Sequence, residues 1–171
     1  MSPITTRLVR TNGIRLHCTI AGDGPLVLLL HGFPECAHSW RHQIPALAAR
    51  HRVVAPDLRG YNLSDKPRSV AAYAIRELVA DVCGLVEAFG ASETDLVGHD
   101  WGGGVAWATA MLEASLVRRL AIVNMPHPLR FQALLTRSPP SASIPFSPNQ
   151  GVFREPSQAT EASVAPILSP S

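Results

Sequence analysis

The stretch Val97-Gly98-His99-Asp100-Trp101-Gly102-Gly103 decides the fold. It lies between a short apolar run, residues 95–97, and an Ala-rich apolar segment, residues 103–113, which are typical of a strand and a helix. A Gly-x-nucleophile-x-Gly pattern in that context indicates a nucleophile elbow, a sharp turn that holds a reactive side chain clear of the sheet. Gly98 and Gly102 are expected where a Cβ atom would collide with neighbouring backbone.

The residue at the centre of this turn is Asp100. A carboxylate is already ionised at neutral pH, and it can attack a saturated carbon to form an alkyl-enzyme ester. The N-terminus of the following helix favours negative charge at this point. Because Gly-x-Asp-x-Gly also arises by chance, the interpretation depends on the flanking elements and on a second motif.

The second motif is His31-Gly32-Phe33-Pro34-Glu35, directly after the apolar run Leu26–Leu30. An oxyanion hole beside such an elbow needs one backbone donor from this loop and one from the residue after the nucleophile. These donors would be the N–H groups of Phe33 and Trp101. Pro34 would help to fix the loop, and a cis Phe33–Pro34 bond fits that role. Gly32 and Pro34 are also ordinary turn residues, so the alternative is a simple strand-to-helix turn.

Short apolar runs alternate with helical patterns through the first 137 residues, which predicts an α/β fold with a mostly parallel sheet. Asn12-Gly13 indicates a two-residue hairpin, so the sheet should begin antiparallel. The expected strands cover residues 6–9, 14–21, 26–30, 52–55, 95–97 and 120–123. The expected helices cover residues 39–50, interrupted by Pro45, 74–89, and 103–113, the last of them buried nearly all round.

Composition narrows the classes of function. The chain has 171 residues and a formal charge of +2, so nucleic acid is not an expected partner. The three cysteines (Cys18, Cys36 and Cys83) are far apart and form no CxxC pair, which argues against a disulfide scaffold and a zinc site. No apolar run approaches the length of a membrane span. We therefore expect a cytoplasmic protein that needs no metal, cofactor or membrane.

The composition changes after residue 137. Residues 138–171 contain 8 Ser and 7 Pro in 34 positions, a density that supports neither a helix nor a sheet. We expect a partial α/β core over residues 1–137 and a disordered Ser/Pro-rich tail over residues 138–171.

Four stretches follow one another along the chain: LVLLLHGFPE (26–35), RVVAPDLRGYNLSDKP (52–67), LVGHDWGG (96–103) and NMPHP (124–128). Together they resemble the α/β-hydrolase superfamily, and within it the soluble epoxide hydrolases. The resemblance implies that Asp100 opens an epoxide ring, and that the N–H groups of Phe33 and Trp101 stabilise the tetrahedral intermediate that follows. It also implies that His31 supports the oxyanion loop and is not a base. We interpret His99 as local packing, and Asp57 with Arg59 as a structural loop pair.

The resemblance also implies groups that we do not find at the expected places. A helical cap with two tyrosines should follow the sixth strand, and a triad acid and a His should follow the cap. The tyrosines of this chain, Tyr61 and Tyr73, precede the nucleophile, and its last histidine is His127. We therefore expect an incomplete α/β-hydrolase fold, running through about strand 6 without the cap and the C-terminal strands. A truncated or frameshifted product of this kind should be unable to hydrolyse an epoxide through repeated catalytic cycles.

Two alternatives remain open. The first is a haloalkane or haloacetate dehalogenase-like hydrolase, which also uses an Asp nucleophile. Many haloalkane dehalogenases have Asn at the position of Phe33, and Phe33 lacks the side-chain N–H that helps to hold a halide. The second is a non-catalytic fragment with an interaction role, for which the sequence specifies neither a partner nor an oligomeric state.

Overall fold

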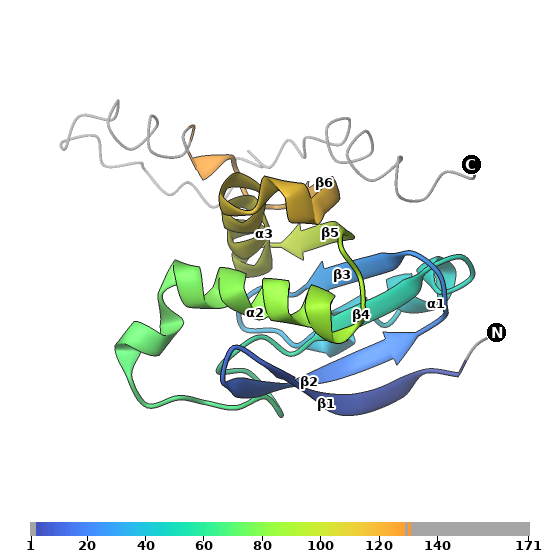
Figure 1. The fold of residues 1–171 in the computed structure, drawn as a ribbon, viewed down its shortest axis with the longest axis horizontal. Helices are drawn as coiled ribbons and strands as arrows, with labels where there is room; N and C mark the ends of the chain where they lie inside the picture. The colour runs from blue at the N-terminus through green and yellow to red at the C-terminus, as the bar shows by residue number, and fades with distance from the viewer. Residues whose placement is uncertain (1–2, 129, 131–171) are drawn as a thin grey trace, which may run out of the picture.

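The computed structural model of the protein describes residues 3–128 and residue 130. In this part of the chain the strands are β1 (Thr5–Thr11), β2 (Ile14–Ala21), β3 (Leu26–Leu30), β4 (Arg52–Pro56), β5 (Thr94–His99) and β6 (Val117–Val123). They form one sheet with the order β1-β2-β4-β3-β5-β6 (Figure 1). β2 pairs antiparallel with both β1 and β4, and the other neighbouring strands are parallel. The predicted α/β architecture is confirmed.

The hairpin that opens the sheet has the predicted turn. Asn12 and Gly13 both adopt positive φ angles, 42° and 75°, between the paired residues Thr11 and Ile14. Two consecutive residues with positive φ match the right-handed twist of the strands that they connect.

The helices are α1 (Gln43–Leu47), α2 (Ile75–Ala88) and α3 (Trp101–Leu112), together with the short 3₁₀ helices η1 (Ala37–Trp40), η2 (Val70–Tyr73) and η3 (Ala114–Leu116). α2 and α3 pack together on one face of the sheet (Figure 1). Leu28 and Leu30 of β3 belong to the hydrophobic cluster on that face, whereas Val27 and Leu29 belong to the cluster around α1 and η1. β3 is therefore buried on both faces, which explains its unbroken apolar sequence.

The predicted bounds of two helices and the predicted burial of one of them were wrong. The helix expected over residues 39–50 is split into η1 and α1, and α1 begins at Gln43 so that Pro45 falls in its first turn. α3 begins at Trp101, two residues earlier than expected. Its last turn exposes Met111 and Leu112, so the helix is not buried on all sides.

Several expectations concern segments outside the described residues. The boundary at residue 137 and the tail over residues 138–171 belong to this group. Within the part of the chain that the structure describes, no helix is long and apolar enough to cross a membrane.

Candidate active site

Asp100 occupies the sharp turn between β5 and α3. Its φ of 48° lies in the left-handed region, which a residue with a side chain adopts at a cost. Gly98 and Gly102 permit the close approach around it: a Cβ on Gly98 would lie 2.4 Å from the Gly102 carbonyl oxygen, and one on Gly102 would lie 2.3 Å from the Leu30 carbonyl oxygen. Both glycines are therefore required where the sequence pattern placed them.

Two backbone donors converge on one oxygen of the Asp100 carboxylate. The N–H groups of Phe33 and Trp101 donate to Asp100 Oδ1 at 3.0 Å and 2.6 Å. These two bonds, with a smaller contribution from His99, hold the pKa of Asp100 below its usual range. Asp100 is thus an ionised carboxylate at neutral pH, as the sequence analysis required of a nucleophile.

His31 holds the loop that carries Phe33. Its ring is fully buried, Nδ1 is 2.8 Å from the Gly32 carbonyl oxygen, and Nε2 is 2.9 Å from the Leu58 backbone nitrogen. Because a carbonyl oxygen only accepts and an N–H only donates, Nδ1 carries the ring proton and Nε2 accepts. Burial lowers the pKa of His31, which agrees with this neutral form. Tyr61 packs edge-on against the ring, with 4.9 Å between the ring centroids.

The loop after β3 also has the expected backbone. The Phe33–Pro34 peptide bond is cis. A Cβ on Gly32 would lie 2.7 Å from Asp100 Cβ, so only glycine lets the loop approach the nucleophile this closely. Gly32 therefore does more here than form an ordinary turn.

A series of hydrogen-bonded polar side chains lies beside Asp100, and the sequence did not predict it. Glu35 Oε2 accepts the Gly32 N–H at 3.0 Å and lies 3.2 Å from His99 Nδ1, and Asn124 Nδ2 lies 3.4 Å from His99 Nε2. Burial tends to raise the pKa of Glu35, but the Gly32 N–H and His99 outweigh it and lower that pKa. His99 is thus hydrogen-bonded between two polar side chains, and its interpretation as local packing was incomplete.

Comparison with known proteins bears directly on this fold. A family model described as "alpha/beta hydrolase fold" matches residues 25–147, which include β3 through β6 and the whole candidate site. The chain belongs to the alpha/beta hydrolase fold family. The match extends ten residues past position 137, and the division of the chain at that point stays a prediction.

Within this family the chain is similar to epoxide hydrolases. It is 50% identical over 129 residues to epoxide hydrolase A of Mycobacterium tuberculosis, an alignment that covers 74% of this chain and 40% of that protein. It is 45% identical over 143 residues to the AB hydrolase superfamily protein YfhM of Bacillus subtilis, covering 82% and 50%. The crystal structure of an epoxide hydrolase from Vigna radiata superposes with a TM-score of 0.71 at 43% identity, covering 72% of this chain and 39% of that one. The chain spans half or less of the length of these relatives.

Asp57 and Arg59 are structural residues, but they do not act as a pair. Arg59 is buried and binds the buried Asp81 through two bonds, Nε to Oδ2 at 2.8 Å and Nη2 to Oδ1 at 2.6 Å, and it also donates to the Ala72 carbonyl oxygen. Asp57 is buried with a separate set of donors. In the described part of the chain, no cluster of three His, Cys, Asp or Glu side chains could hold a metal.

Proposed function

We propose that this chain carries the nucleophile and the oxyanion donors of an epoxide hydrolase-like alpha/beta hydrolase, with Asp100 as the nucleophile. The observation that carries the proposal is the convergence of the Phe33 and Trp101 N–H groups on Asp100 Oδ1. The similarity to epoxide hydrolases at 40–50% identity supports a small epoxide as the substrate class.

The two oxygens of the Asp100 carboxylate have different roles in the proposed reaction. Oδ1 is bound by two N–H donors, so Oδ2 is the oxygen that attacks. A lone pair of Oδ2 forms a bond to one ring carbon of the epoxide, and the bond between that carbon and the ring oxygen breaks. The ring oxygen leaves as an alkoxide that takes a proton from solvent water, and the product is an ester between Asp100 and a 2-hydroxyalkyl group.

The same donors serve the second step. When water adds to the ester carbonyl carbon of Asp100, negative charge develops on Oδ1 and not on Oδ2. The N–H groups of Phe33 and Trp101 already point at Oδ1, so they stabilise that charge without reorganisation. Collapse of the intermediate breaks the bond between this carbon and Oδ2, which releases the diol and restores the carboxylate.

The remaining site residues support this arrangement. Gly98, Gly102 and Gly32 allow the close backbone approaches, and Pro34 and His31 shape the loop that presents Phe33. The resemblance to epoxide hydrolases assigns alkoxide protonation and water activation to groups beyond the matched motifs. For this chain the proposal is therefore limited to ester formation at Asp100, and diol release is a quantity that the test measures.

The test is a time course with an aryl epoxide in excess, followed by intact-protein mass and by diol release. We expect the mass to rise by one epoxide per chain, and Asp100→Ala to abolish this rise. Asp23→Asn is the matched control, because Asp23 is an exposed carboxylate held by Arg52 and it should leave labelling unchanged. Equal labelling of Asp100→Ala and the unmodified chain would refute the proposal.

A parallel incubation with a 1-haloalkane separates the alternative within the same family. Halide release that outpaces labelling by the epoxide would favour a dehalogenase, in which the same Asp100 ester forms with loss of halide. Phe33 argues against this outcome, since its side chain has no N–H to offer a halide.

A further inference from the structure

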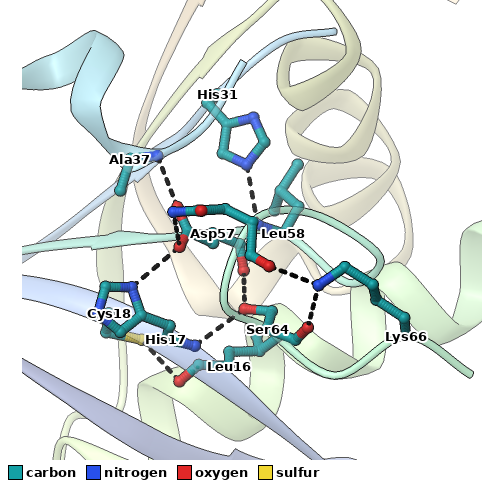
Figure 2. A network of polar contacts seen from close by, with 10 residues as sticks. Leu16, His17, Cys18, His31, Ala37, Asp57, Leu58, Ser64 and Lys66 are labelled. Carbon is teal, nitrogen blue, oxygen red and sulfur yellow. Dashed lines mark hydrogen bonds and ion pairs between the residues drawn. The ribbon is translucent and has the colours of Figure 1, made fainter. Parts of the chain in front are cut away.

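Asp57 accepts hydrogen bonds from three different segments of the chain. It follows β4 directly and is completely buried. Oδ1 accepts the Ala37 backbone N–H at 2.8 Å, and Oδ2 lies 2.9 Å from both His17 Nδ1 and Asn62 Nδ2. Figure 2 shows Asp57 at the centre of this network, with Ala37 and His17 on different sides of it.

The backbone of Asp57 is itself anchored to β2. Its N–H donates to the His17 carbonyl oxygen at 2.8 Å, and its carbonyl oxygen accepts the Ser64 hydroxyl at 2.5 Å. Ser64 Oγ in turn accepts the His17 N–H at 2.9 Å. The carboxylate of Asp57 is thus a fixed point, and the groups bound to it are held relative to the sheet.

The loop of residues 31–37 follows β3 and is bound at both ends. Leu58, the residue after Asp57, binds the first residue of this loop, His31. Its N–H donates to His31 Nε2 (Figure 2), while the Asp57 carboxylate holds Ala37. The residues between these two contacts, 31–37, include Phe33, whose N–H donates to Asp100. Two consecutive residues after β4 therefore hold both ends of the loop that lies over the nucleophile.

We propose that Asp57 is a positioning residue for the candidate active site: by holding Ala37 it sets the position of the Phe33 N–H relative to Asp100. The inference rests on the proposed function in so far as this N–H acts on an Asp100 ester. The placement of the N–H is a separate matter that can be measured without any reaction.

The Phe33 side chain does little to fix the position of the Phe33 N–H, so that position depends on the backbone contacts of the loop. The Phe33 residue is 70% exposed, so side-chain packing contributes little to its position. Its N–H lies 3.0 Å from Asp100 Oδ1, and a hydrogen bond weakens steeply once that distance exceeds about 3.5 Å. A displacement of the loop by about half an ångström is thus enough to weaken this bond.

The pairing of His17 with Asp57 does not point to acid–base chemistry on Asp100. The two side chains line a cavity of about 310 Å³ together with Cys36, His38 and Asn62, among others, and neither Asp100 nor Phe33 lines it. The described contacts link Asp57 to the nucleophile through the 31–37 loop. A positioning role is therefore the one that the contacts support.

The test uses the full chain and compares Asp57→Ala, Asp57→Asn and a matched control, Asp65→Asn. Asp65 follows β4, as Asp57 does, but it pairs with Arg15 at the surface. Its replacement should therefore leave the 31–37 loop unchanged. Nuclear magnetic resonance follows two signals at native conditions, the Phe33 amide and the pKa of the Asp100 carboxyl. Loss of stability alone moves neither signal.

In Asp57→Ala we expect the Phe33 amide to shift, and the Asp100 pKa to rise by about half to one pH unit as one donor is weakened. Asp57→Asn keeps a carbonyl oxygen for the Ala37 N–H, so it should restore most of both signals, and Asp65→Asn should match the unmodified chain. If Asp57→Ala does not fold, Asp57→Ser replaces it, because its hydroxyl is too short to reach the Ala37 N–H but keeps a polar group at this buried position. A folded Asp57→Ala or Asp57→Ser with both signals unchanged would overturn the proposal.

The rate at which the Asp100 ester hydrolyses, measured as loss of the epoxide label with time, then connects the two proposals. We expect it to fall about tenfold in Asp57→Ala, because the Phe33 N–H stabilises the charge that develops on Oδ1 in this step, and to be unchanged in Asp65→Asn. If the unmodified chain is not labelled at all while the Phe33 amide still moves, the proposed function fails and the positioning role stands. If labelling occurs and neither signal moves, the positioning role fails and the proposed function stands.

Discussion

Replacing Gly102 with Ala should destabilise the protein, whereas the same change two residues along the same helix should not. A Cβ on Gly102 would lie 2.3 Å from the Leu30 carbonyl oxygen and 2.5 Å from the His31 carbonyl oxygen. Neither oxygen can rotate away, because both belong to the backbone at the end of β3. A contact of about 3.0 Å or more requires α3 and β3 to separate by roughly 0.7 Å, and overpacking of this kind costs about 1–3 kcal/mol.

Gly104 is the matched control. A Cβ there meets only Met125 Cε at 3.4 Å, an ordinary contact, so Gly104→Ala should gain about 0.5–1 kcal/mol from the helix backbone. The two variants should therefore differ by about 1.5–4 kcal/mol in the free energy of unfolding. Urea unfolding followed by circular dichroism measures this as a difference of about 1 M or more between their midpoints. Gly102→Ala as stable as Gly104→Ala would refute the close contact between the elbow and β3.

Two further predictions concern buried charge and pH. Arg59→Met should lower the free energy of unfolding by about 3–5 kcal/mol, because it leaves the buried Asp81 carboxylate without its partner. Adding Asp81→Leu to this variant should recover most of that loss. A double variant that is no more stable in urea than Arg59→Met would contradict this. Burial lowers the pKa of His31, so below pH about 6.5 the unfolded chain takes up a proton that the buried ring does not. The contribution of His31 to stability is therefore complete above this pH. Below it, that contribution is lost by up to about 1.4 kcal/mol per pH unit. His31→Gln should flatten this decline between pH 7 and 5.5, and an identical decline in both proteins would show that His31 is not its source.

The elements that the sequence predicted best are those whose cause is local. The Asn12-Gly13 hairpin depends on two adjacent residues that tolerate positive φ, and the turn at Asp100 depends on glycines two residues away on either side. The α1 boundary was harder to predict, because Pro45 is compatible with either an interrupted long helix or the first turn of a short one.

The parts of the site that the sequence did not predict depend on neighbouring strands. Glu35 and His99 are 64 residues apart, and they meet because β3 and β5 are adjacent and parallel, so that their carboxyl ends lie together. Knowledge of that pairing would have been enough to predict the contact. The sequence did not predict the partner of Arg59 for another reason. Asp81 lies on α2, and its approach to Arg59 depends on the path of the loop after β4.

The most direct test of the account is to locate the adduct that an aryl epoxide leaves on the protein. Trypsin cleavage after Arg76 and Arg118 gives a peptide that contains Asp100 together with other carboxylates and Cys83, so fragmentation of this peptide identifies the modified residue. We predict a single adduct on Asp100 that hydroxylamine removes, as it removes an ester. An adduct on Cys83 or spread over several exposed carboxylates, with Asp100 unmodified, would contradict the assignment of Asp100 as the nucleophile.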